Sequence, residues 1–344
     1  MFSIFSVDKI DTFMVRGNGM RYRRNPYSSG YSAGRVLKKL SGFILILVLA
    51  ILTGAAIGQK QVVTNSGTTL KPLKTGYVPV NGVKMYYEIY GTGKRLVLIH
   101  GGLGEIEMFG QLISQLAAER EVFAIDLQGH GRTADINRPL SYEAMADDVA
   151  KLIWSFGLGS VDVMGYSLGA GVALQLTIRH PETVLRLVSV SFPARRDGWF
   201  HSVLSNEARL NKSTAEMMKQ SLVYAMYAKL APRPGDWTAL VGKTGDLLKR
   251  DYDWSDAIRQ IACPVLLVYA DADAVRPQAM LDFFGLLGGG MAPANWDGSG
   301  RPVSQLSILP GLSHYSICSS PALGSVVLPF LEKPLPAPPV DEKN

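Results

Sequence analysis

The 344-residue sequence contains few cysteines and few histidines, and its net charge comes from one end. Its two cysteines, Cys263 and Cys318, are too few for a disulfide scaffold and do not have the spacing of a metal site. We interpret them as partly buried thiols. The five histidines leave a short set of candidates for acid–base chemistry. Because 47% of the residues are hydrophobic, the composition excludes a disordered chain and predicts a large folded domain.

The formal net charge of +6 comes from residues 1–40, which hold eight lysines and arginines against two aspartates. The rest of the chain is neutral in sum. A basic leader on a neutral domain argues against nucleic-acid binding and favours membrane targeting.

An apolar segment, Phe43–Ile57, follows the basic residues Lys38 and Lys39 and contains fifteen uncharged residues. A bilayer-spanning helix needs about 20 apolar residues, whereas the core of a signal peptide has roughly 7 to 15. The length favours a signal peptide, and the small residues Ala56 and Gly58 suit a cleavage site. We therefore expect export, to the periplasm or the medium, after cleavage. The alternative is an uncleaved membrane anchor that holds the domain outside the cytoplasm.

Composition divides the chain into a leader over 1–58, a polar linker over 59–76, a domain over 77–331 and a proline-rich tail over 332–344. The domain opens with two strand-like runs around Asn81-Gly82, a dipeptide that suits a two-residue hairpin turn. Continuous apolar runs then alternate with helical patterns: RLVLI, EVFAI, VDVMG, LRLVSV, PVLLVYA and LSILP. This alternation predicts a parallel sheet with crossover helices, whose chemistry lies at the carboxyl ends of the strands.

The stretch Gly165-Tyr166-Ser167-Leu168-Gly169 fits the pattern GxSxG at a strand-to-helix junction. The glycines allow strand and helix to approach closely, and the serine oxygen is exposed on a strained turn. We predict that Ser167 is a nucleophile.

The glycine-rich stretch after another strand, "HGGLG" from His100 to Gly104, offers backbone N–H groups that side chains do not block. An oxyanion needs about two such donors. We expect Leu168, the residue after the serine, to supply one of them and Gly102 to supply the other.

His314, in "PGLSHYS" just beyond the last strand, is the strongest candidate for the base. The other four histidines lie in turns, at a helix end or away from strands and are predicted to be structural: His100, His130, His180 and His201. The acid should come between serine and histidine in chain order, and Asp271 and Asp273 both follow the strand Val265–Ala270. We favour Asp273, because a turn position lets a carboxylate lean toward the neighbouring loop more readily than a strand end does.

Together these motifs resemble the α/β-hydrolase superfamily, in particular the esterase-like group with a separate cap that is described as pimeloyl-carrier methyl-ester carboxylesterase-like. The resemblance covers roughly residues 76–331 and includes "DLQGHGRT" and "RHPETVLRLV". It implies an α/β-hydrolase fold, with a mostly parallel central sheet, an N-terminal antiparallel hairpin and a helical cap over about 194–261. Its acid position agrees with Asp273, and its catalytic and oxyanion residues agree with those named above.

We predict a serine hydrolase that cleaves carboxylic esters through an acyl-enzyme, with a small, partly apolar ester or acyl substrate and no cofactor or metal. A carbon–carbon bond hydrolase, a lactonase or a perhydrolase could use the same triad, and a ligand-sensing domain could keep the triad without turnover. Large side chains of the cap region are expected to contribute to an apolar pocket: Trp199, Phe200, Tyr224, Tyr227, Trp237 and Trp254.

Overall fold

The computed structural model describes residues 70–335. The predicted signal or anchor segment, 43–57, lies outside the described residues, as do most of the predicted linker and tail. In the part that is described, no helix has both the length and the apolar character needed to cross a bilayer.

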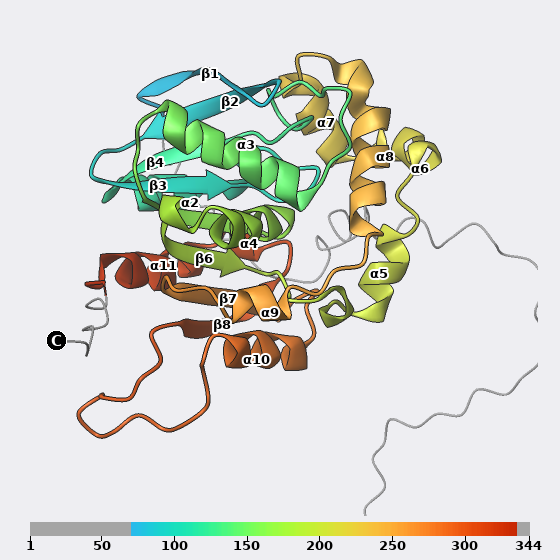
Figure 1. Ribbon diagram of the computed structural model, residues 1–344. Helices are drawn as coiled ribbons and strands as arrows, with labels where there is room; N and C mark the ends of the chain where they lie inside the picture. The colour runs from blue at the N-terminus through green and yellow to red at the C-terminus, as the bar shows by residue number, and fades with distance from the viewer. Residues whose placement is uncertain (1–69, 336–344) are drawn as a thin grey trace, which may run out of the picture. The chain divides into compact units, whose positions relative to one another are not determined.

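Eight strands form one sheet in the order β1-β2-β4-β3-β5-β6-β7-β8 (Figure 1). Their bounds are Lys74–Val80 (β1), Val83–Tyr90 (β2), Lys94–Ile99 (β3), Arg120–Ile125 (β4), Val161–Tyr166 (β5), Val184–Val190 (β6), Val265–Ala272 (β7) and Gln305–Ser313 (β8). Strand β2 is antiparallel to both β1 and β4, and all other neighbours are parallel. The predicted mostly parallel sheet with an antiparallel start is confirmed.

The hairpin of β1 and β2 turns at the predicted dipeptide, where Asn81 and Gly82 have φ values of 46° and 85°. Two successive positive φ values fit the turn type that matches the twist of a hairpin. The pairing extends back to Lys74, opposite Ile89, so the first strand begins at Lys74. The expected domain start at Tyr77 was therefore too late, because the polar residues before it are held by backbone pairing rather than by apolar burial.

Helices cover both faces of the sheet. Their bounds are Gln111–Ala117 (α2), Tyr142–Ser155 (α3), Leu168–Arg179 (α4), His201–Glu207 (α5), Lys212–Met218 (α6), Leu222–Leu230 (α7), Trp237–Leu248 (α8), Ser255–Ile258 (α9), Pro277–Leu286 (α10) and Pro321–Glu332 (α11). Buried residues of α3, α4, α9 and α10 share one hydrophobic cluster, and those of α2 and α11 share the other. The predicted cap region contributes α5 to α9 between β6 and β7, and Figure 1 shows α5, α6 and α8 beyond the arrowheads of the central strands.

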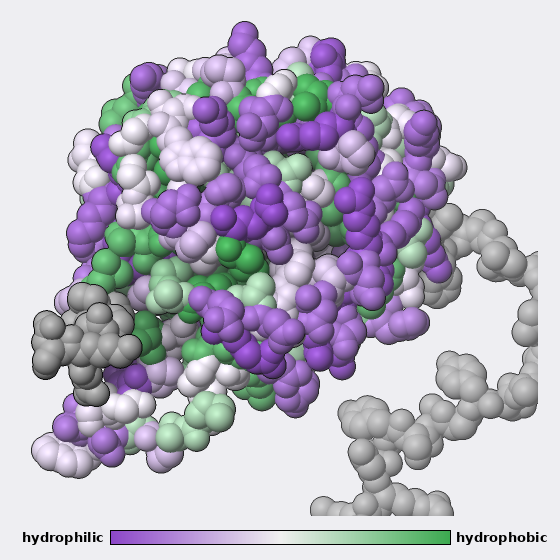
Figure 2. All heavy atoms as spheres, in the orientation of Figure 1, coloured by the Kyte–Doolittle hydropathy of each residue, from purple (hydrophilic) through white to green (hydrophobic). Residues whose placement is uncertain are grey.

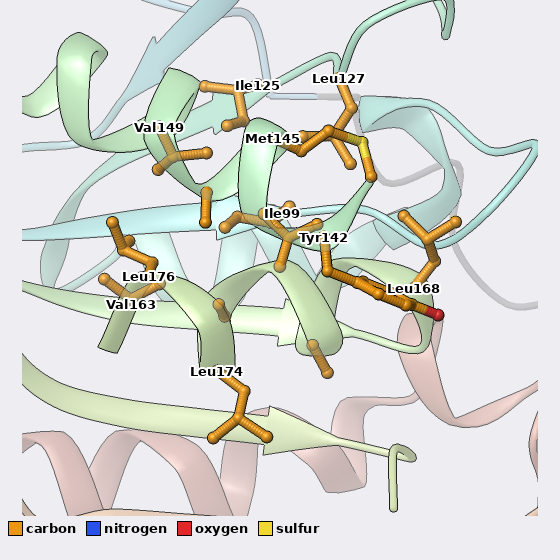
Figure 3. Close-up of a cluster of buried hydrophobic side chains, with 14 of the residues drawn as sticks. Ile99, Ile125, Leu127, Tyr142, Met145, Val149, Val163, Leu168, Leu174 and Leu176 are labelled. Carbon is orange, nitrogen blue, oxygen red and sulfur yellow. The ribbon is translucent and has the colours of Figure 1, made fainter. Parts of the chain in front are cut away.

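Side chains of the central strands are buried alternately in the two clusters. In β3, Val97 and Ile99 belong to the cluster with α3 and α4, whereas Leu96 and Leu98 belong to the cluster with α2 and α11. Figure 3 shows part of the first cluster, in which Ile99 and Met145 join β3 to α3. Because both faces are covered, the strands appear in the sequence as continuous apolar runs.

The glycine-rich segment 283–302 begins with helix, because α10 continues to Leu286 and buries Phe283. The loop that follows extends away from the helices at the lower left of Figures 1 and 2, and its Trp296 is 99% exposed. The loop enters β8 at Gln305, whereas His314 follows the other end of β8. It therefore lies at the opposite end of the strand from His314.

A buried ion network joins three strands of the sheet. The Asp162 carboxylate of β5 accepts hydrogen bonds from Arg120 of β4 and from Arg186 of β6, the latter at 3.2 Å between Nη1 and Oδ1. All three side chains are at most 5% exposed. Arg120 also contacts Glu332 of α11 at 2.6 Å between Nη2 and Oε1. The carboxylate of Asp162 is thus shared by two buried guanidinium groups.

We predict that Asp162→Asn lowers the free energy of unfolding by about 3–5 kcal/mol, because it leaves buried guanidinium charge without its partner. A matched control is Glu121→Gln, which breaks the exposed pair of Arg95 and Glu121 (3.4 Å) and is expected to cost less than about 1 kcal/mol. Urea unfolding of both variants measures the difference. Equal small losses of unfolding free energy in the two variants would show that the buried network contributes no more to stability than the exposed pair.

Candidate active site

Ser167 forms the corner between β5 and α4. Its backbone has φ 52° and ψ −123°, a conformation that costs a non-glycine residue free energy. The flanking glycines allow this corner: a Cβ on Gly169 would lie 2.2 Å from the carbonyl oxygen of His100, and a Cβ on Gly165 would lie 2.2 Å from that of Gly169. Strand and helix therefore touch backbone to backbone on either side of the serine.

The structure brings the three predicted residues Ser167, His314 and Asp273 into one hydrogen-bonded chain. The Oγ atom of Ser167 lies 3.1 Å from Nε2 of His314, and Nδ1 of His314 lies 2.9 Å from Oδ1 of Asp273. A carboxylate accepts but does not donate, so Nδ1 carries the proton and Nε2 is left to accept from the serine. The imidazole is therefore set in the tautomer that a general base needs.

Asp273 is buried, yet it has four hydrogen-bond donors. Besides His314, Oδ1 accepts from the N–H of Val275 at 3.3 Å, and Oδ2 accepts from Ser191 Oγ at 2.6 Å and from the N–H of Ala270 at 2.9 Å. Burial alone would raise the pKa of Asp273. The bond and charge of His314, together with the bonds from Ser191 and Ala270, outweigh burial and lower the pKa below its ordinary value. Sequence analysis did not identify Ser191, because no motif marks it.

Asp271 has a different environment from Asp273. It is exposed, and its carboxylate accepts from the N–H groups of Gly311 (2.9 Å) and Leu312 (3.2 Å) in β8. These bonds lower the pKa of Asp271 below its ordinary value, and the bond from Gly311 has the largest effect. Strand β7 continues to Ala272, beyond the expected end at Ala270, because these side-chain bonds to β8 extend the pairing of the two strands. Asp271 thus ties two strands together and does not reach His314.

The two residues predicted to supply the oxyanion donors, Gly102 and Leu168, lie close together. A Cβ on Gly102 would lie 3.2 Å from Cδ1 of Leu168, and a Cβ on Gly101 would lie 3.4 Å from Cβ of Ser167. Among residues 70–335, the N–H of Gly102 has no acceptor. Leu168 is the first residue of α4, where N–H groups have no partner within the helix. Neither N–H group therefore has an acceptor among the described residues.

The other histidines have structural partners or lie at the surface. His100 and His130 are fully buried, and burial lowers their pKa values to about 3 and about 4. Nε2 of His100 accepts from the N–H of Leu127 at 3.0 Å, which joins two loops. Nε2 of His180 lies 2.7 Å from Oδ1 of Asp147. The rings of His100 and His130 lie 5.1 Å apart, centroid to centroid. His201 is exposed at the start of α5.

Most of the cap aromatics pack on one another. Trp237 is fully buried between Tyr224 and Tyr227, so these three form the interior of the cap. Trp254 stacks on the cluster that includes Phe192. Trp199 differs, because its ring lies 5.7 Å from the ring of His314. Of the six aromatics expected to contribute to a pocket, Trp199 is therefore the one that contacts the proposed triad, and Phe200 is 41% exposed.

A partly buried carboxyl that the sequence did not reveal lies on the cap side. Burial raises the pKa of Glu207, the last residue of α5, to about 7, although the charge of Arg196 opposes this. Burial and the charge of Glu207 raise the pKa of Tyr315, the neighbour of His314. A group that changes its charge near neutral pH thus lies near the candidate site.

Within residues 70–335, no group of three or more potential metal ligands is present.

The chain belongs to the α/β-hydrolase family, and it is a hydrolase. A family model for the alpha/beta hydrolase fold matches residues 94–220. The chain is 31% identical, over 55% of its length and 79% of the relative's, to a pimeloyl-[acyl-carrier protein] methyl ester esterase of Neisseria meningitidis serogroup C. It is 28% identical, over 56% and 78%, to a putative carbamate hydrolase of Azorhizobium caulinodans. An uncharacterized hydrolase of Bacillus subtilis is 33% identical, but the match spans only 42% of that protein.

Solved structures show the same fold at low identity. An E-2-(acetamidomethylene)succinate hydrolase superposes with a TM-score of 0.59 at 20% identity and covers 76% of this chain and 99% of that one. The carboxylesterase CesB of Bacillus subtilis gives 0.57 at 22% identity, over 75% and 91%. The fold class predicted from the sequence is confirmed.

We predict that Gly169→Ala strongly destabilises the domain or prevents folding, because its Cβ would overlap the backbone oxygen of His100. The matched control is Gly285→Ala. Gly285 is also helical, in α10, but a Cβ there would meet no atom within 4 Å, so alanine should leave the melting temperature unchanged or raise it. Soluble yield and thermal unfolding measure both variants. A Gly169→Ala domain as stable as the wild type would contradict the close contact.

Proposed function

We propose that the chain is a serine hydrolase of carboxylic esters, with Ser167 as nucleophile, His314 as general base and Asp273 as the acid that orients the histidine. The observation that carries this proposal is the hydrogen-bonded chain of the three side chains, with distances of 3.1 Å and 2.9 Å. Hydrogen bonds of this order are what proton transfer from the serine requires.

In the first step, His314 takes the proton of Ser167 while the serine oxygen attacks the ester carbonyl carbon. The carbonyl oxygen becomes negative, and the N–H groups of Gly102 and Leu168 would bind it. The N-terminus of α4 also favours negative charge at this place. Asp273 stabilises the positive imidazolium. Collapse of the tetrahedral intermediate expels the alkoxide, which takes the proton from His314 and leaves as the alcohol.

In the second step, water attacks the acyl-enzyme, and His314 again acts as the base. The acid leaves, and the proton returns to the oxygen of Ser167. The Neisseria relative is named as a methyl ester esterase, which supports an ester as the substrate class. A lactone is an internal ester, so the same two steps would open it.

We predict that Ser167→Ala abolishes labelling by a fluorophosphonate and lowers ester turnover by roughly 10⁴-fold or more, because no nucleophile remains. The assay uses p-nitrophenyl esters of increasing chain length and a panel of lactones. Thermal unfolding of the variant is the control for folding. Near-native turnover by the alanine variant would exclude Ser167 as nucleophile, and a labelled wild type that hydrolyses no member of the panel would favour the sensor alternative.

A second pair of variants tests the acid. We expect Asp273→Asn to lower kcat/KM by about 10³-fold or more, because an amide in place of the carboxylate favours the wrong imidazole tautomer. Asp271→Asn, two residues away, is expected to have little effect, since Asp271 bonds to the backbone of β8 and not to His314. Measurement of kcat/KM on one ester compares the two. A large loss at Asp271 with near-native activity at Asp273 would reverse the assignment.

A further inference from the structure

Within residues 70–335, four residues other than glycine have a left-handed backbone: Asn81, Leu103, Ser167 and Ser191. Asn81 forms the hairpin turn. Leu103 and Ser167 lie in the two loops that meet at the proposed reaction site. Strained residues of this kind cluster at functional sites. Ser191, with φ 57°, lies in the bend directly after β6.

The position of Ser191 is fixed by the sheet. It follows β6 directly, and its N–H donates to the carbonyl of Val268 in β7 at 2.9 Å. The residue is fully buried. With the backbone held there, the side chain reaches past the end of β6 and donates from Oγ to Oδ2 of Asp273 at 2.6 Å. The left-handed conformation and the bond to Asp273 occur at the same residue.

Each oxygen of the Asp273 carboxylate has one side-chain donor and one backbone donor. Oδ1 accepts from His314 and from the N–H of Val275, and Oδ2 accepts from Ser191 and from the N–H of Ala270. Because the carboxylate has two equivalent oxygens, a bond at Oδ2 decides where Oδ1 points. Ser191 therefore donates to the carboxylate oxygen that does not bond to His314.

We propose that Ser191 is a positioning residue of this site: its hydroxyl fixes the Asp273 carboxylate in the orientation that presents Oδ1 to Nδ1 of His314. The contribution of Ser191 to catalysis rests on the proposed function, whereas its effect on the Asp273–His314 hydrogen bond does not. The chain of side chains thus has four members, from Ser191 through Asp273 and His314 to Ser167.

Ser189 provides a matched control in the same strand. It is fully buried, like Ser191, but its Oγ has no hydrogen-bond partner among the described residues. Ser189→Ala removes an equally buried hydroxyl from β6 and takes no donor from Asp273. A loss of kcat that occurs only in the Ser191 variants would then come from the lost bond to Asp273. It would not come from the removal of a buried hydroxyl in general.

The test compares Ser191→Ala, Ser191→Gly and Ser189→Ala. Both Ser191 variants lack the hydroxyl, and glycine also accepts the left-handed φ without strain, so a folded variant is available even if alanine destabilises the domain. We expect both to lower kcat on a p-nitrophenyl ester by about tenfold to hundredfold, the range for a lost hydrogen bond to a charged group, with little change in KM. Ser189→Ala should retain wild-type kcat.

A second readout needs no turnover. The far-downfield proton NMR signal of Nδ1–H in His314 reports its bond to Asp273, and we expect this signal to shift or broaden in both Ser191 variants but not in Ser189→Ala. Wild-type kcat with an unchanged signal would overturn the proposal. Recovery of kcat in Ser191→Gly after a loss in Ser191→Ala would also overturn it, since the backbone and not the hydroxyl would then matter. If the wild type shows no ester turnover, the proposed function fails, and the NMR signal alone decides the role of Ser191.

Discussion

The close contact of α4 with the loop after β3 is the constraint on which the candidate site depends. Only one residue, Ser167, separates the end of β5 from the start of α4, and it takes the left-handed conformation that joins them. The contact requires a glycine at Gly169, whose missing Cβ leaves room for the carbonyl of His100. The Leu168 side chain also packs close to Gly102, where a Cβ would lie 3.2 Å from its Cδ1. The close contact thus places the serine and both residues that are candidates to supply oxyanion donors in one small region.

The parallel sheet supplies the remaining members from distant parts of the chain. Strands β5, β6, β7 and β8 are successive neighbours, so their carboxyl ends lie in a row. Ser167, Ser191, Asp273 and His314 follow these four strands in the same order. Hydrogen bonds join Ser191 to Asp273, Asp273 to His314 and His314 to Ser167. Ser167 and His314 are 147 positions apart in the sequence, and the sheet brings the ends of the strands that they follow to the same edge. The site is therefore a direct consequence of the topology.

Features of the fold and site that depend on adjacent residues could be predicted from the sequence. Features that depend on contacts between distant residues could not. The hairpin at Asn81, the apolar strands and the corner at Ser167 each depend on a few adjacent residues, so the sequence was sufficient. The end of β7 was misplaced, because Asp271 extends the strand through bonds to β8 that no local pattern shows. Ser191 was missed for the same reason, since its partner lies 82 residues away. The raised pKa of Glu207 could not be predicted either, because it depends on how the folded chain shields this carboxyl from water.

A comparison of the buried carboxyls indicates why Asp273 has so many donors. Burial raises the pKa of Glu105, Asp126 and Glu207 to about 7 in each case. Even Asp126 reaches this value, although its carboxylate accepts from two backbone N–H groups, those of Ile106 and Arg132. Asp273 has two further donors, the side chains of Ser191 and His314, and its pKa is lowered instead.

The donors around Asp273, together with the charge of His314, thus favour its ionised form, whereas burial dominates at Asp126. Only an ionised Asp273 can stabilise an imidazolium on His314. The bonds around this carboxylate are therefore part of the chemistry that the site can perform, and not only of the packing that surrounds it.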